Sequence, residues 1–504
     1  MFVEITFYPF ILYIATKKLP SAKVVFLHKN AVKGGRTEFF MTSVQTVLNF
    51  FEEIDSIPRS SYHTDKIADY CVRFAQNRGL EYRRDALNNV IIKKPATADR
   101  VDRPPVILQG HLDMVCEKEP DYDIDFLTEG LTLRKEDGYL FAEGTTLGAD
   151  DGIAVAYALA LLDSHDIPHP PLEVVFTTDE EVGMTGAAGI DLSDLQGSTV
   201  LNIDSEVEGV LTVGCAGGAT VCCTLPIRRT TASGNLYRIE ISGLTGGHSG
   251  VEIHKGRVNA AILAGQLLNH LDGELISIEG GLKDNAIPPR SAIMILSETD
   301  PNPICQALSE QTKSAEKNIQ ITAKLVETGT YSVLTPESLD AVKAFLSRVP
   351  NGVQRMSADI PELVQTSLNL GILKTEDGEI SASFSVRSSV KAEKQDLIAK
   401  LTRLTEQFGG SVAVSGDYPA WEYREHSPLR TLMSEIFTEQ YGYAPKIEVI
   451  HAGLECGILS EKLKNPDCVS FGPNILDIHT PAERLELAST ERVWNFILEI
   501  LKRI

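Results

Sequence analysis

Histidine and carboxylate side chains stand at the ends of apolar segments in this chain. His111 and Asp113 follow the apolar run 105–110. Because side chains alternate along an extended strand, these two residues project to the same side. A neutral imidazole binds a metal ion well, and a neighbouring carboxylate can orient the ring or a reacting water. Taken alone, the pair is more typical of a polar strand end that faces solvent.

Two further apolar segments end in acidic residues. Segment 172–178 runs into Asp179, Glu180 and Glu181, and segment 200–203 leads to Asp204 and Ser205-Glu206. Adjacent carboxylates repel one another unless a cation neutralises them. A solvated acidic turn is the alternative at either position, but the repetition favours a cation site.

A glycine-bounded loop, 144–152, precedes an Ala- and Leu-rich segment, 153–162, that predicts a helix. Such a loop at a helix N-terminus can hold a phosphate group. Here Asp150 and Asp151 occupy the critical place and would repel a phosphate. The loop therefore also favours a cation site.

With His479 from the far end of the chain, the candidate metal ligands number five. Imidazole and carboxylate ligands suit zinc, with manganese or cobalt as alternatives. The set is too large for one tetrahedral catalytic site but suits two metals bridged by a carboxylate, about 3.5–4 Å apart with a water between them. Glu180, beside a ligand, is the natural general base for that water, and Asp113 can accept the other ring N–H of His111. The five ligands are His111, Asp150, Glu181, Asp204 and His479.

The elements that position these residues alternate between strands and helices, which indicates an α/β layer with a largely parallel sheet. Sites in such sheets lie beyond the carboxyl ends of the strands. From about Gly217 the pattern changes to α+β, with a helix expected over 257–271 and an N-cap at Thr335, and from about Ser427 the first pattern returns. We therefore predict an inserted domain, long enough for two small lobes. The predicted division is an uncertain, dispensable N-terminal extension over 1–40, a catalytic domain over 41–217 and 427–504, and an inserted lid domain over 218–426.

Composition excludes several classes of protein. The 504 residues carry a net charge of −22, which argues against a nucleic-acid binder because such proteins present a basic face. No stretch is long and apolar enough to span a bilayer, so no membrane partner is expected. The eight cysteines are scattered without a CxxC pair. This usage is typical of reduced thiols in a cytosolic protein and predicts a cytoplasmic location.

Several motifs together resemble one known family. They are residues 109–115 (QGHLDMV), 144–150 (GTTLGAD), 180–181 (EE), 202–206 (NIDSE), 246–250 (GGHSG) and 451–457 (HAGLECG). The chain resembles the two-zinc exopeptidases of the glutamate-carboxypeptidase/aminoacylase superfamily, and within it the aminoacyl-histidine (Xaa-His) dipeptidases. The resemblance covers essentially everything after Met41. It implies an α/β/α-layered zinc-exopeptidase catalytic domain with an inserted α+β lid domain.

The resemblance also implies a role for each candidate residue. His111 and Asp204 would hold one zinc, Glu181 and His479 the other, and Asp150 would bridge them. Glu180 would act as acid/base, and Asp113 would position His111. In the lid, His248 would stabilise the oxyanion, while Asn285 and Arg387 would bind substrate, including its carboxylate. Asp151 follows Asp150 where relatives often have Asn, so the identity of the bridging aspartate stays open.

The expected function is metal-dependent hydrolysis of dipeptides, with Xaa-His dipeptides as substrates and two divalent ions, zinc first, as cofactors. The same site would also serve a broad dipeptidase, a tripeptidase or an N-acyl amino acid deacylase. An alternative of another class is a catalytically silent metal- or peptide-binding protein. A homodimer is left open, as is whether His248 acts within its own chain.

Overall fold

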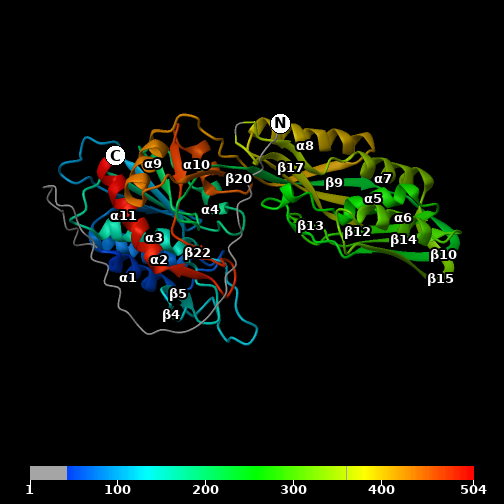
Figure 1. Cartoon of the computed structure of the whole chain (residues 1–504), viewed down its shortest axis with the longest axis horizontal. Coiled ribbons are helices and arrows are strands. Elements are labelled where there is room, and N and C mark those ends of the chain that lie inside the picture. Colours follow the sequence, from blue (N-terminus) through cyan, green and yellow to red (C-terminus); the bar gives the residue numbers. More distant parts are fainter. Residues whose placement is uncertain (1–42, 359) are drawn as a thin grey trace, which may run out of the picture. The chain divides into compact units, whose positions relative to one another are not determined.

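The computed structural model describes residues 43–358 and 360–504, and the predicted extension 1–40 lies outside these residues. Figure 1 shows the described elements along the chain. Among them, no helix combines the length and apolar composition needed to cross a lipid bilayer.

One sheet contains eight strands from both ends of the described chain. Their order is β1 (Glu81–Arg84), β2 (Val90–Lys94), β6 (Leu172–Thr177), β3 (Val106–His111), β7 (Thr199–Asn202), β21 (Asp467–Ser470), β8 (Val210–Cys215) and β20 (Lys446–Ile450). Strands β6, β3, β7 and β21 run parallel, whereas β1 and β2 are antiparallel to their neighbours and β21 meets β8 in antiparallel fashion. The sheet is therefore mixed, with a parallel centre where the sequence predicted a largely parallel sheet.

Helices cover both faces of this sheet. Along β3, a Cβ at Gly110 would meet Asp151 and Ala154 of helix α3, whereas the neighbouring Gln109 donates to Glu455 of helix α10. Because adjacent strand residues face opposite sides, α3 and α10 lie on opposite faces. All six residues of β3 are buried, as expected for a strand covered on both sides. The helices of this part of the chain are α1 (Val44–Asp55), α2 (Asp65–Arg78), α3 (Ala149–Asp163), α4 (Thr185–Gly189), α9 (Pro428–Tyr441), α10 (Glu455–Lys462) and α11 (Leu487–Arg503).

The second large sheet is antiparallel and is built from residues between Gly217 and Tyr418. Its order is β15 (Gln320–Leu334), β10 (Arg229–Ser242), β14 (Ser291–Ser297), β12 (Glu274–Gly280), β17 (Val364–Thr375), β18 (Glu379–Ser388), β9 (Gly217–Pro226) and β19 (Ser411–Tyr418), with β16 (Gly352–Met356) on β17. The expected fold class, an α/β layer with an inserted α+β domain, is confirmed; the structure adds that the first sheet is mixed and the second antiparallel. The boundaries 217/218 and 426/427 stay a prediction.

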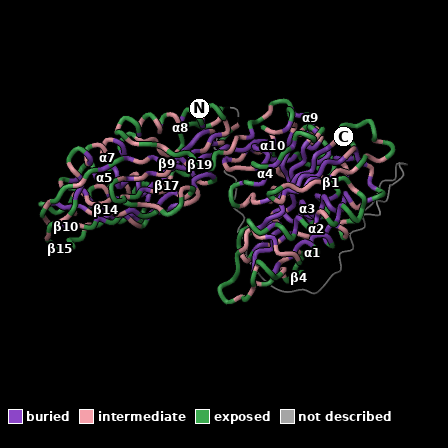
Figure 2. The backbone as a smooth tube through the Cα atoms, turned by 180° about the vertical axis from the view of Figure 1, so that it is seen from behind, coloured by how far each residue is buried: buried purple, intermediate pink, exposed green. Residues whose placement is uncertain are grey.

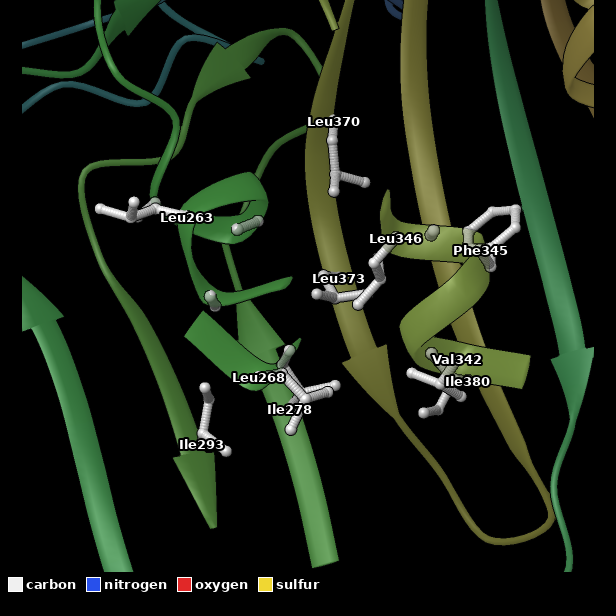
Figure 3. Close-up of a cluster of buried hydrophobic side chains, with 14 of the residues drawn as sticks. Leu263, Leu268, Ile278, Ile293, Val342, Phe345, Leu346, Leu370, Leu373 and Ile380 are labelled. Atoms are coloured by element: carbon white, nitrogen blue, oxygen red, sulfur yellow. The ribbon is translucent and has the colours of Figure 1, made fainter. Parts of the chain in front are cut away.

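Helices α5 (Ala260–His270), α6 (Asn302–Thr312), α7 (Pro336–Arg348) and α8 (Lys391–Gln407) pack against this antiparallel sheet. Strand β10 alternates buried Ile239 and Ile241 with exposed Arg238 and Glu240, so one face of the sheet carries the core. Figure 3 shows Leu268 of α5 and Phe345 of α7 among the strand residues of that core. One sheet therefore spans the inserted segment, where the sequence allowed two small lobes. Buried residues follow the central strands of both sheets (Figure 2).

Local signals placed most element ends within a few residues. The predicted cap at Thr335 is confirmed, since its side chain accepts from the amide of Ser338 at the start of α7. Helix α5 begins at Ala260 and not at Arg257, because the Asn259 side chain accepts from the amides of Ala261 and Ile262. The prediction followed the apolar spacing and overlooked Asn259 as the N-cap residue.

Two small sheets complete the described chain. Strands β11 (Gly247–His248) and β13 (Ala286–Ile287) form an antiparallel pair. Strands β4 (Leu133–Glu136) and β5 (Tyr139–Ala142) form a hairpin around Asp137-Gly138, which β23 (Arg484–Glu486) and β22 (Ile475–Leu476) extend. The second of these sheets joins a segment before α3 to the C-terminal region that carries His479.

The core of the antiparallel sheet gives a first prediction. Leu268 is fully buried, so Leu268→Ala should lower the free energy of unfolding by about 3 kcal/mol through lost burial and the cavity left behind. Urea denaturation followed by circular dichroism measures the change. Leu282 is 94% exposed, and Leu282→Ala should change that free energy by less than about 0.5 kcal/mol. Equal losses in both variants would contradict the assignment of Leu268 to the core.

Candidate metal centre

Three neighbouring parallel strands deliver candidate ligands to one edge of the mixed sheet. His111 is the last residue of β3, Glu181 follows the end of β6, and Asp204 follows the end of β7. Since β3 lies between β6 and β7 with both pairs parallel, their carboxyl ends meet at the same edge. The expectation that these strand ends converge is therefore confirmed.

Asp150 lies between the two histidines. Its Oδ1 is 3.2 Å from Nε2 of His111, and its Oδ2 is 3.3 Å from Nε2 of His479. Asp204 joins the first histidine, with 3.8 Å between Asp204 Oδ1 and His111 Nε2. Glu181 joins the second, with 3.2 Å between Glu181 Oε2 and His479 Nε2. Each oxygen of Asp150 thus belongs to a different imidazole–carboxylate pair.

The charges of this cluster fit a cation. The Asp150 and Glu181 carboxylates raise the pKa of His479 to about 10 against the opposing effect of burial. The positive charge of the protonated His479 balances these carboxylates, and a bound cation could balance them in the same way. Glu181 Oε1 is buried without a hydrogen-bond partner, as expected of an oxygen that awaits a ligand. His111, Asp150 and Glu181 bring ligand atoms within 4.8 Å of one another, so these side chains fit a metal ion.

Asp151 has a different environment from Asp150. Its Oδ2 accepts from the backbone amide of His111 at 3.1 Å, and the residue is 1% exposed. Burial raises the pKa of Asp151 well above its usual value. One of its oxygens also lies near ligand atoms of His111 and Asp204. However, only Asp150 contacts both histidines, which favours Asp150 as the shared residue.

Asp113 links the two strand ends behind the cluster. Its Oδ1 accepts from the backbone amide of Glu180 at 3.1 Å, and its Oδ2 accepts from Ser61 Oγ at 2.8 Å. His111 Nδ1 lies 3.5 Å from Asp113 Oδ1 and 3.1 Å from its backbone oxygen. Burial alone would raise the pKa of Asp113, but His111, Ser61 and the Glu180 amide hold it below its usual value. Asp113 is therefore an anionic acceptor that orients its neighbours.

Glu180 stands beside the cluster without joining either pair. Burial and the carboxylates of Glu455, Glu181 and Asp150 raise the pKa of Glu180 to about 8, against the opposing charge of His111. A carboxyl group with a pKa near neutrality can both take up and release a proton. This is the behaviour expected of a general acid/base.

Two buried charged residues that the sequence analysis missed hold the loop before α3. The Glu483 carboxylate accepts from the amides of Leu147, Gly148 and Ala149 at 2.8–3.0 Å. Arg59, buried with Asp55, donates to the carbonyl oxygen of Gly148 at 2.6 Å. No local signal marked either residue, since more than eighty residues separate each from the loop. Their contacts set the position of Asp150.

The three remaining candidates lie in the inserted segment. His248 pairs with Ala286 across β11 and β13, which brings it next to Asn285. His248 Nδ1 accepts from the amides of Gly250 and Val251 at 3.1 and 3.2 Å, so Nε2 carries the hydrogen of the neutral ring. Burial and the charge of Arg387 lower the pKa of His248. His248 is therefore a neutral donor near Arg387.

The described chain supplies no carboxylate partner for Arg387. Its Nη1 donates to the Tyr418 hydroxyl at 3.0 Å, and its Nε is buried without a partner. A guanidinium held in this way is suited to bind an anion. The structure thus forms one group around Asp150 and a second group around Arg387.

This combination of a mixed α/β sheet, a separate antiparallel sheet and a carboxylate–histidine cluster is found in metallopeptidases. The chain belongs to peptidase family M20/M25/M40, whose model matches residues 107–503.

Among its relatives, the cytosol non-specific dipeptidase of Escherichia coli (strain K12) is 36% identical over 482 residues, covering 93% of this chain and 99% of that protein. The crystal structure of the aminoacylhistidine dipeptidase from Vibrio alginolyticus has a TM-score of 0.83 at 36% identity, covering 91% of this chain and 96% of that chain. The aminopeptidase PepT of Bacillus cereus, at 16% identity, shares the fold, with a TM-score of 0.54 over 91% of this chain and 98% of that chain.

The contacts of Glu483 give a second prediction. In Glu483→Gln the amide group cannot accept from all the backbone N–H groups, so the loop should shift and metal affinity should fall by about tenfold or more. Competition with a chromogenic chelator measures the affinity. Glu491, exposed on α11, provides the control: Glu491→Gln should bind metal like the unmodified protein. An unchanged affinity in Glu483→Gln would refute a role for Glu483 in placing Asp150.

Proposed function

We propose that this chain is a metal-dependent dipeptidase that hydrolyses Xaa-His dipeptides. The observation that carries the proposal is Asp150, whose two oxygens each face a separate imidazole–carboxylate pair. Membership of the peptidase family supports hydrolysis of a peptide bond. Relatives named cytosol non-specific dipeptidase and aminoacylhistidine dipeptidase, each matched over most of both chains, support dipeptides as substrates.

The proposed cofactors are two divalent metal ions, zinc first, with cobalt or manganese as alternatives. His111 and Asp204 would hold one ion, Glu181 and His479 the other, and Asp150 both. When bound, such a pair activates a water and polarises the substrate carbonyl. The proposed ligands supply the nitrogen and oxygen donors that this chemistry needs.

Proton transfer is the proposed task of Glu180. Its carboxylate would take the proton from the attacking water and deliver it to the leaving amine. Asp113 accepts a hydrogen bond from the Glu180 amide and faces His111 Nδ1, so it would keep both residues in place. The Nε2–H of His248 would donate to the oxyanion that develops on the carbonyl oxygen.

Substrate binding is proposed for Asn285 and Arg387. The guanidinium of Arg387, without a carboxylate partner in the described chain, would donate to the free carboxylate of the dipeptide. Asn285 is exposed next to His248 and would donate to the substrate backbone. We also propose a cytoplasmic location, in keeping with the eight free cysteines and the name of the Escherichia coli relative.

A substrate panel tests the proposed function. Metal-reconstituted protein should hydrolyse Xaa-His dipeptides, and a chelator should abolish turnover until zinc, cobalt or manganese is added back. Turnover is measured as amine release. Hydrolysis that persists in chelator would refute metal dependence. Activity on tripeptides or N-acyl amino acids but not on dipeptides would assign the site to a different amide hydrolysis.

The general base gives a separate prediction. Glu180→Gln should lower kcat by about 100-fold or more, because the amide cannot carry the proton, while the metal content stays the same. Steady-state kinetics and metal analysis measure the two quantities. The adjacent Asp179 accepts from the Tyr62 amide and contacts none of the five proposed ligands, so Asp179→Asn is the matched control and should keep its kcat. Near-normal turnover in Glu180→Gln would remove Glu180 from the mechanism.

A further inference from the structure

Arg387 and Tyr418 lie on opposite sides of one glycine. Gly218 of β9 pairs with Arg387 of β18 on one side and with Tyr418 of β19 on the other. A Cβ at Gly218 would lie 2.4 Å from the Tyr418 hydroxyl oxygen. The phenol therefore lies over the glycine backbone, and this position lets its oxygen accept from Arg387 Nη1 at 3.0 Å.

Tyr418 is held from several directions. A Cβ at Gly453, in the loop before α10, would lie 2.8 Å from Tyr418 Cε2 and 3.1 Å from its hydroxyl oxygen. Lys394, itself 2% exposed, donates to the Tyr418 carbonyl oxygen and to the carboxylate of Asp417. Two glycines beside the ring and a buried lysine at the backbone thus fix the position of Tyr418.

The hydrogen of the Tyr418 hydroxyl group is free to donate to a ligand. Its oxygen accepts from Arg387, but among the described residues nothing accepts the hydrogen of the Tyr418 hydroxyl. Burial raises the pKa of Tyr418, and the nearby Glu180 adds to the effect against the opposing charge of Arg387. The phenol therefore stays protonated at neutral pH. A half-buried O–H donor beside a guanidinium without an anionic partner in the described chain makes a two-part anion site.

We infer that Tyr418 is a substrate-binding residue, and that its O–H and the guanidinium of Arg387 together bind the free carboxylate of the dipeptide. This inference rests on the proposed function. The neutral Tyr418 hydroxyl and the charged Arg387 guanidinium would then together select peptides with a free C-terminus.

The test uses Tyr418→Phe, which keeps the ring and removes only the hydroxyl group. The KM for alanyl-histidine should rise about tenfold or more, as expected for losing a hydrogen bond to a charged group, with kcat nearly unchanged. For alanyl-histidinamide, which lacks the carboxylate, KM or the inhibition constant should change less than about twofold. Tyr157→Phe is the matched control, since it also removes a tyrosine hydroxyl, one that donates to the Thr490 carbonyl oxygen. This control should leave both constants unchanged.

A binding measurement separates this inference from the proposed function. Calorimetric titration of the metal-loaded protein with histidine and with histidinamide needs no turnover. Tyr418→Phe should weaken histidine binding about tenfold and leave histidinamide binding unchanged. If the unmodified protein cleaves no dipeptide but discriminates in this way, the proposed function fails and the carboxylate site stands.

Three results would overturn the inference. They are an unchanged KM in Tyr418→Phe, equal losses for the acid and the amide, and a loss confined to kcat. The second would give Tyr418 a purely structural role. The third would place its hydroxyl at the transition state and not at the carboxylate.

Discussion

Mutual repulsion among buried carboxylates is the constraint on which the rest of this structure depends. Asp150 stands between His111 and His479, while Asp204 and Glu181 join them from either side. Such a cluster is stable only when positive charge balances it. The surrounding chain holds the carboxylates in place, so a pair of divalent ions would meet ligands that are already oriented.

The support for this cluster comes from residues that do not themselves face an ion. Arg59, which precedes the loop that carries Asp150, and Glu483, which follows it in the chain, both hold that loop. Asp113 ties the end of β3 to the backbone of Glu180. A displacement of even an ångström would disturb both ligand geometry and proton transfer, which explains why buried charged groups are retained at these positions.

The group of donors around Arg387, in the inserted segment, has the opposite electrostatic character. Arg387, His248 and Tyr418 present donors, and the described chain offers no carboxylate to the guanidinium. A dipeptide carries an anionic end and a scissile carbonyl that becomes negative during hydrolysis. The donors around Arg387 and the cation-binding cluster around Asp150 are together suited to such a substrate.

Local patterns determined much of this protein from the sequence by itself. Apolar runs that end in His111, Glu180-Glu181 and Asp204 predicted the parallel strands and the cation site, because strand period and charge repulsion are local properties. Motifs spread along the chain indicated the family, and the change of pattern near Gly217 indicated the inserted α+β domain. The capping residue Thr335 predicted the start of a helix for the same local reason.

Only the tertiary structure decided which distant residues meet. Asp150 rather than Asp151 contacts both histidines, although the two aspartates are chemically identical neighbours in the sequence. Glu483 reaches the loop from more than three hundred residues away, and Tyr418 reaches Arg387 across Gly218. These contacts depend on strand order and on how closely backbones approach, and those quantities exist only once the sheets have formed.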